Sequence, residues 1–131
     1  MVPKFIVKLN MLKPLGVIYH SCQAIYPYIL SPQYVIEGYK ANNPKFIALI
    51  EHEFVHFKRI EEVGFFKWYL LYAFNPKFRL KEELLGYKKQ IKMLRENNIK
   101  VDIDDFARIL SSFTYLNMVS KDKAKSLLSE L

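Results

Sequence analysis

The feature that most constrains this sequence is the pentapeptide His52-Glu53-Phe54-Val55-His56, an HExxH motif. On an α-helix its two histidines lie one turn apart on the same face, where both can bind one zinc ion. The glutamate between them is then placed to accept a proton from a water that the zinc activates. The motif therefore predicts a zinc-dependent hydrolase, most plausibly a peptidase, with metal ligands His52 and His56 and with Glu53 as general base.

The motif lies in a segment that we expect to form a buried helix from Pro44 to Val63. Asn43 can cap this helix, proline is favoured in its first turn, and Gly64 ends it. Most of its circumference is apolar, with Phe46, Ile47, Leu49, Ile50, Phe54, Val55, Phe57 and Ile60. Burying two histidines and a glutamate in such a helix is unfavourable unless they are paired. This favours a bound metal ion over a chance occurrence of the motif.

A catalytic zinc site usually has three protein ligands, so a third ligand must lie elsewhere in the chain. If it is a histidine, only His20 remains. A histidine six residues after the second motif histidine would mark the metzincin pattern, but Glu62 occupies that position. The glycine of that pattern is replaced by Arg59. Glu62 remains a candidate only if the helix ends early.

The preferred third ligand lies on a long helix expected from Lys77 to Glu96. Its apolar residues recur at helical spacing, namely Leu80, Leu84, Tyr87, Ile91 and Leu94. Glu83 lies beside this stripe and should face inward. Glu82 is the alternative, and it lies on the flank with Gly86, which we expect to be closer to solvent. Glycine is unfavourable inside a helix, so Gly86 suggests that another backbone approaches closely there.

The other elements follow from local patterns. Short strands are expected within residues 4–9, 17–26 and 34–36, with a turn at 13–16, although residues 17–26 could equally form a helix. An aromatic helix should cover residues 65–74 and pack over the HExxH helix, although it could also touch a membrane or line a substrate groove. Two further helices are expected after the caps Asp102 and Ser120, the last one ending at Leu131.

These elements predict a single domain, residues 1–131, with a helix-rich α+β fold of four to five helices. The N-terminus does not resemble a signal peptide, and the densest apolar run is about half of the roughly twenty residues that a membrane span needs. The single cysteine, Cys22, cannot form an internal disulfide and is expected to be a buried apolar side chain. We therefore expect a cytoplasmic protein.

The net charge is +7, and residues 77–100 contribute eight basic side chains against three glutamates. Such a segment could bind nucleic acid, anionic lipid or an acidic partner. The solvated face of a long helix explains it more simply. Because no nucleic-acid-binding motif is present, we do not expect a nucleic-acid partner.

An HExxH helix followed about thirty residues later by a helix with a candidate glutamate ligand resembles the gluzincin plan of thermolysin-like peptidases. Residues 49–59, 64–66, 68–69 and 83–90 are similar to small metallopeptidase-like proteins of phages and prophages, so the resemblance covers residues 44–95. It implies a minimal zincin-like domain with a Zn²⁺ cofactor and a peptide or protein substrate.

In related gluzincins an acidic residue one turn after the ligand glutamate often orients a zinc-bound histidine. Here that position is Tyr87, whose hydroxyl could accept the same hydrogen bond less strongly. The resemblance also implies that a peptide binds along a strand next to the HExxH helix, within residues 1–43. Tyr19, His20, Tyr72 and Tyr87 are the candidate donors to an oxyanion.

The alternative function is a zincin-like domain that binds metal without catalysis and acts by interaction, for example as a phage or mobile-element regulator. The basic segment would then be its contact surface.

Overall fold

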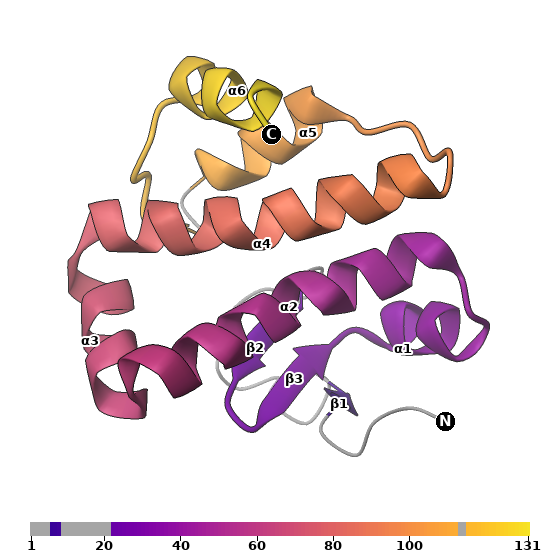
Figure 1. Cartoon of the computed structure of the whole chain (residues 1–131), viewed down its shortest axis with the longest axis horizontal. Coiled ribbons are helices and arrows are strands. Elements are labelled where there is room, and N and C mark those ends of the chain that lie inside the picture. The colour runs from indigo at the N-terminus through magenta and orange to yellow at the C-terminus, as the bar shows by residue number, and fades with distance from the viewer. Residues whose placement is uncertain (1–5, 9–21, 113–114) are drawn as a thin grey trace.

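The computed structural model describes residues 6–8, 22–112 and 115–131, and Figure 1 shows how their elements are arranged. These residues form a three-stranded sheet and six helices. The strands are β1 (Ile6–Lys8), β2 (Gln23–Ile25) and β3 (Tyr28–Ser31). The helices are α1 (Gln33–Lys40), α2 (Pro44–Val63), α3 (Phe65–Phe74), α4 (Pro76–Glu96), α5 (Ile103–Leu110) and α6 (Lys121–Ser129). The helix-rich α+β class is confirmed, and the described residues form six helices where four to five were expected.

The HExxH helix, α2, has the predicted ends. The Asn43 side chain accepts a hydrogen bond from the Lys45 backbone N–H at 3.0 Å, which satisfies one of the free amides of the first turn. Gly64 has a φ of +99°, a conformation that glycine adopts without steric cost. It ends α2 and begins α3 at a single residue, so the chain turns sharply there.

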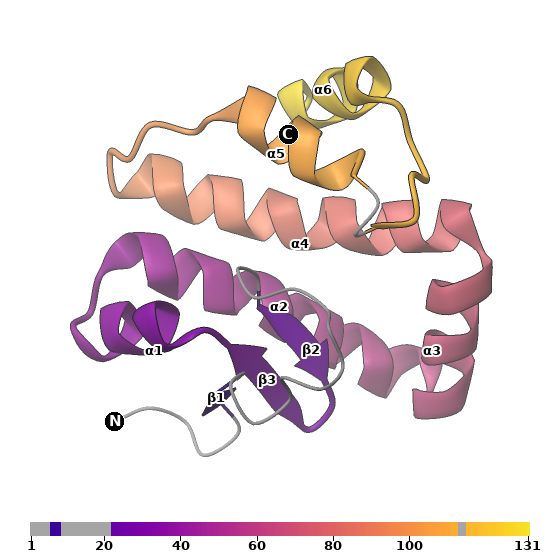
Figure 2. The same cartoon turned by 180° about the vertical axis from the view of Figure 1, so that it is seen from behind.

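Helices α2 and α4 run antiparallel side by side, and α3 joins them across one end of the molecule (Figures 1 and 2). The sheet and α1 lie against the outer side of α2, whereas α5 and α6 cover the outer side of α4. An apolar core occupies each outer side. The core under α2 is built from Cys22, Ile29, Val35, Ile36 and Ile50. The core above α4 is built from Tyr87, Ile91, Ala107, Leu110, Ala124 and Leu128.

The strand order is β1-β3-β2, with β1 parallel and β2 antiparallel to β3. Ala24 of β2 lies opposite Ile29 of β3, and Ile25 lies opposite Tyr28. Among the described strands β2 is at one edge of the sheet, and it contacts α2.

Predictions for the N-terminal third were partly wrong. β1 lies within the expected residues 4–9, and β2 lies within the expected residues 17–26. Residues 17–21 and the expected turn at 13–16 are outside the described residues. The expected strand at 34–36 is part of α1, and β3 was not expected. Tertiary packing explains the error, because helical spacing buries adjacent Val35 and Ile36 together against α2, and this burial outweighs their slight preference for strands.

The remaining helix ends are close to expectation. Asn75 caps α4, which begins one residue early at Pro76, and Asp102 and Ser120 cap α5 and α6 through their side chains. Helix α6 ends at Ser129 rather than at Leu131. No helix in the part of the chain that the structure describes is long and apolar enough to cross a membrane.

Candidate metal centre

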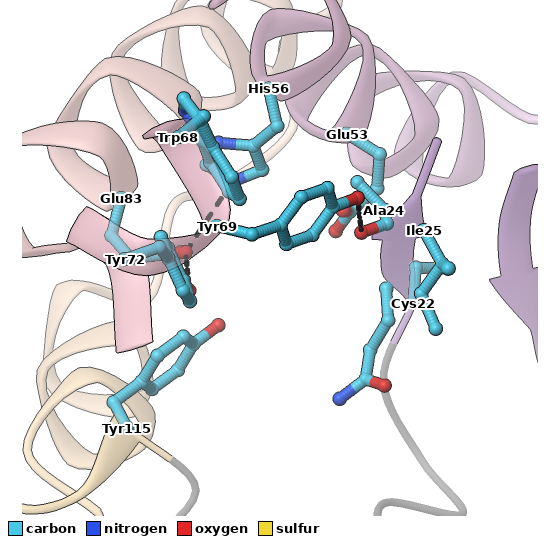
Figure 3. Close-up of a pocket in the computed structure, with 11 residues that line it drawn as sticks. Cys22, Ala24, Ile25, Glu53, His56, Trp68, Tyr69, Tyr72, Glu83 and Tyr115 are labelled. Atoms are coloured by element: carbon cyan, nitrogen blue, oxygen red, sulfur yellow. Dashed lines mark hydrogen bonds and ion pairs between the residues drawn. The ribbon is translucent and has the colours of Figure 1, made fainter. Parts of the chain in front are cut away.

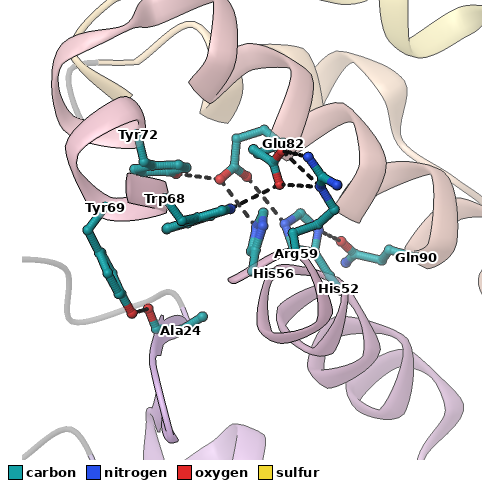
Figure 4. Close-up of polar contacts among 10 residues, drawn as sticks. Ala24, His52, His56, Arg59, Trp68, Tyr69, Tyr72, Glu82 and Gln90 are labelled. Atoms are coloured by element: carbon teal, nitrogen blue, oxygen red, sulfur yellow. Dashed lines mark hydrogen bonds and ion pairs between the residues drawn. The ribbon is translucent and has the colours of Figure 1, made fainter. Parts of the chain in front are cut away.

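The facing sides of α2 and α4 carry buried polar side chains between the two apolar cores. His52 and His56 of α2 meet Glu83 of α4, and all three are buried. His52 Nε2 lies 3.2 Å from Glu83 Oε2, and His56 Nε2 lies 3.4 Å from Glu83 Oε1. One ligand atom of each residue lies within 4.8 Å of the other two. The three residues predicted as ligands from sequence therefore converge, and Figure 4 shows the two histidines of this group on α2.

The geometry of these three groups fits a zinc ion. Two imidazole nitrogens and one carboxylate oxygen are a common ligand set of catalytic zinc. Ligand atoms about 2.0–2.2 Å from a tetrahedral ion are separated from one another by about 3.3–3.6 Å. The separations of 3.2 and 3.4 Å from Glu83 to the two histidines are close to that range. These two separations end at different oxygens of Glu83, so one oxygen shared by both histidines would require the three ligand atoms, now within 4.8 Å of one another, to move closer together.

The charges of the histidines and of Glu83 shift one another's pKa. Burial alone would lower the pKa of His56, but the Glu83 carboxylate outweighs it and raises that pKa to about 9. Burial alone would raise the pKa of Glu83, but the two histidines hold it well below its usual range. The carboxyl is thus ionised at neutral pH, while His56 carries a proton that must leave before its nitrogen can bind a metal.

His52 is oriented by Gln90, a residue for which sequence analysis predicted no role. His52 Nδ1 lies 3.0 Å from Gln90 Oε1. An amide oxygen only accepts, so the Nδ1–H donates to it, and Nε2 is left as the ring nitrogen that faces Glu83 and would bind a metal. Tyr87, the residue expected to make this bond, instead packs its ring edge-on against His52 at 4.7 Å. Gln90 lies two helical turns after Glu83, which places both on the face of α4 toward α2.

Gly86 lies on this same face. A Cβ atom at this position would be 2.5 Å from His52 Nε2 and 2.6 Å from Cδ2. The close approach expected from this glycine is real, but it is made by an imidazole ring rather than by a backbone. Gly86 therefore provides the space in which His52 lies.

Glu82, the alternative ligand, has a different role, and its expected exposure to solvent was wrong. Its side chain is 0% exposed and accepts hydrogen bonds from Arg59 Nε at 3.1 Å and Trp68 Nε1 at 3.1 Å (Figure 4). Trp68 of α3 packs against the side of α4 that carries Glu82, and the sequence pattern had assigned this side to solvent. Glu62 lies on the outside, 46% exposed, where it pairs with Arg59 Nη1 at 2.7 Å. Neither carboxylate points to the histidines.

A pocket of about 220 Å³ opens beside the three ligand candidates. Figure 3 shows that β2, the HExxH helix and the aromatic side chains of α3 surround it. Its lining residues are Cys22, Gln23, Ala24, Ile25, Glu53, His56, Trp68, Tyr69, Tyr72, Glu83 and Tyr115. Burial raises the pKa of the Cys22 thiol to about 12, so this side chain stays protonated as expected.

Glu53, the predicted general base, lines this pocket. Burial raises the pKa of its carboxyl, and the backbone N–H of Ala24 donates a hydrogen bond to it. Tyr72 stacks on Trp68 with ring centroids 4.6 Å apart and donates its hydroxyl proton to Glu83 Oε1. Of the four candidate oxyanion donors, only Tyr72 is seen to line the pocket, and Tyr19 and His20 lie outside the described residues.

Two other tyrosines complete the pocket and were not predicted. Tyr115 lies after α5, far from the motif in sequence, and burial raises its pKa well above the usual value. The Tyr69 hydroxyl accepts a hydrogen bond from the Tyr26 backbone N–H at 2.9 Å and donates to the Ala24 carbonyl at 3.4 Å (Figure 3). Tyr69 thus binds backbone groups along the pocket side of β2. No local pattern could have identified either residue.

No protein-family model, no curated protein and no solved structure matches this chain. The functional argument therefore rests on the chemistry of the site itself.

Proposed function

We propose that this protein is a zinc-dependent metallopeptidase of the gluzincin type, with His52, His56 and Glu83 as zinc ligands and Glu53 as general base. The observation that carries the proposal is the convergence of the three ligand atoms between α2 and α4, beside a pocket that Glu53 also lines. A ligand set of two histidines and a carboxylate leaves one position on a tetrahedral zinc ion for water or substrate. A bound zinc supplies Lewis acidity and makes water acidic enough to ionise near neutral pH.

The chain's own residues supply the proton transfers. Burial raises the pKa of Glu53, which makes its carboxylate a stronger base than an exposed one. The Ala24 N–H holds this carboxyl at the pocket wall. Burial also keeps the Tyr72 and Tyr115 hydroxyls protonated. Tyr115 can donate a hydrogen bond to a negative charge that develops on a peptide carbonyl, and Tyr72 can do so only after its hydroxyl leaves Glu83.

A peptide substrate would lie along β2 as an added strand, which uses the backbone groups of a sheet edge. Within residues 1–43, where the peptide was expected to bind, β2 is the strand whose residues line the pocket, whereas residues 34–36 are helical. A peptide in that position must compete with Tyr69 for the Ala24 carbonyl and the Tyr26 N–H. Substrate binding would therefore include the displacement of the Tyr69 hydroxyl.

The test compares wild type, Glu53→Gln and Glu83→Ala, with Glu51→Gln as a control on the same helix. Bound zinc is measured by elemental analysis and cleavage by mass spectrometry of a peptide mixture. We expect Glu53→Gln to keep zinc but to lose at least about a hundredfold in cleavage rate, and Glu83→Ala to lose zinc. Unchanged cleavage by Glu53→Gln would refute the proposed role of Glu53.

A second candidate is a metal-binding domain that acts by interaction, as a phage or mobile-element regulator. The contacts of Tyr69 favour it, because they already occupy backbone groups that a substrate would need. This alternative predicts a wild-type protein that holds zinc and cleaves no peptide in the mixture.

A further inference from the structure

Helix α3 has two chemically different faces, and only one belongs to the metal centre. Trp68 and Tyr72 point inward to the ligands and the pocket. On the other face Phe66, Leu70 and Phe74 recur every four residues and are 80%, 61% and 82% exposed. This spacing aligns them along one side of the helix. We call these three residues the α3 apolar face.

The position of this face in the fold leaves it open. Helix α3 forms one end of the molecule, where it crosses from α2 to α4 (Figures 1 and 2). The exposed side chains of this face therefore lie on a helix at the end of the molecule. Single exposed apolar residues are common in proteins, but three large ones aligned on one helix usually mark a contact surface.

The exposed charged residues of α3 and of the first two turns of α4 are all lysines, whereas the exposed Glu61 and Glu62 lie at the end of α2. No acidic residue occurs between Glu62 and Glu82 in the sequence. Within that interval Lys67 lies beside the face on α3, and Lys77 and Lys81 follow on the first turns of α4, all three exposed. The nearby Glu62 is neutralised by Arg59 at 2.7 Å. Large apolar side chains flanked by exposed lysines are the pattern of a surface that binds anionic membranes.

We propose that the α3 apolar face docks on an anionic lipid bilayer, with the two phenyl rings and the leucine among the acyl chains. Lys67, Lys77 and Lys81 then lie at the level of the lipid phosphates. The helix lies in the membrane surface, because it has only ten residues and is too short to span. This contact would hold the pocket on the inner side of α3 next to the bilayer.

A second copy of the chain fits this face less well. A symmetric contact through α3 would bring the lysines of both copies together, and each copy carries a net charge of +7. A phospholipid surface instead offers negative charge beside an apolar interior. Lys67, Lys77 and Lys81 beside the face match such a surface in charge.

The test is flotation of the full-length, zinc-loaded protein with vesicles of phosphatidylcholine alone or of phosphatidylcholine and phosphatidylglycerol in equal parts. We expect the wild type to float with the anionic vesicles and not with the neutral ones. Phe66→Ser/Leu70→Ser/Phe74→Ser should remain at the bottom of the gradient. Lys67→Gln/Lys77→Gln/Lys81→Gln should bind more weakly, by about fivefold for each lysine.

The matched control is Leu116→Ser, an exposed leucine between α5 and α6 that is 57% exposed. It should float like the wild type. Circular dichroism and zinc content report whether each variant keeps its fold. The proposal is overturned if the wild type does not float with anionic vesicles, if the triple serine variant floats equally well, or if the wild type is a dimer that this variant converts to a monomer. None of these outcomes depends on peptidase activity.

Discussion

Gly86→Ala offers the sharpest test of how the metal centre is built. An added Cβ would lie 2.5 Å from His52 Nε2, whereas ordinary contact begins at 3.4 Å, so the two atoms must separate by a further 0.9 Å. His52 cannot move freely, because Gln90 binds its Nδ1 and the Tyr87 ring packs against it. Metal sites tolerate displacements of about 0.2 Å. We therefore expect zinc affinity to fall by at least about a hundredfold.

Gly86→Ala changes the free energy of unfolding in two ways, through the contact of the new Cβ with His52 and through the higher helix propensity of alanine, and a second background separates them. Alanine is favoured over glycine inside a helix by about 1 kcal/mol, while overpacking costs about 1–3 kcal/mol. The free energy of unfolding of the metal-free protein should fall by about 0–2 kcal/mol in the wild-type background. In a His52→Ala background the ring is absent, and the same change should stabilise the protein by about 1 kcal/mol.

The assays are urea unfolding of the metal-free proteins and zinc competition with a chromophoric chelator. The difference between the two backgrounds measures the contact between the Cβ and the imidazole. If Gly86→Ala binds zinc as tightly as wild type, or if its effect on stability is the same with and without His52, then the account of Gly86 is wrong.

Three further predictions concern the surroundings of the ligands. Gln90→Leu leaves the Nδ1–H of His52 without its acceptor, so zinc affinity in chelator competition should fall about 10–100-fold while the fold is retained. Glu82→Gln removes the buried charge that pairs with Arg59, and the free energy of unfolding in urea should fall by about 3 kcal/mol, with zinc stoichiometry unchanged. His56 has a pKa of about 9 in the metal-free protein, so at pH 7 zinc must displace one proton. Apparent affinity should rise about tenfold for each pH unit from 7 to 9 and then level off.

Each of these predictions has its own contrary outcome. Unchanged affinity in Gln90→Leu would mean that His52 is oriented by another group. Glu62→Gln is the control for Glu82→Gln, because Glu62 is partly exposed and its loss should change stability by less than about 1 kcal/mol. Loss of zinc rather than of stability in Glu82→Gln would make Glu82 a ligand. A flat affinity from pH 7 to 9 would show that His56 is already neutral.

The arrangement of α2 and α4 also explains why zinc should stabilise the fold. Two apolar cores lie on the outer sides of these helices, but the inner sides meet through two histidines and two glutamates, all buried. Arg59 and Trp68 satisfy one of these carboxylates, Glu82. The other, Glu83, contacts both histidines and Tyr72, so a metal ion at that point would offset the charge of a buried carboxylate.

The sequence by itself determined the features that depend on neighbouring residues. Asn43, Pro44 and Gly64 set both ends of α2, because capping and termination act within a turn of the helix. The helical repeat then placed His52 and His56 on one face. These steps need no knowledge of the rest of the chain, and the same is true of the ends of α3.

Only the tertiary structure decided which residues meet across the helices. Helix α4 is buried on two sides, and the apolar stripe that was read as its inward face packs against α5 and α6 rather than against α2. The side toward α2 carries Glu83, Gly86 and Gln90, and only the packing of α2 on α4 selects it. Glu83 could be proposed because the motif demanded a third ligand. Gln90, Tyr69 and Tyr115 could not, because a hydrogen bond between distant segments leaves no periodic signal in either one.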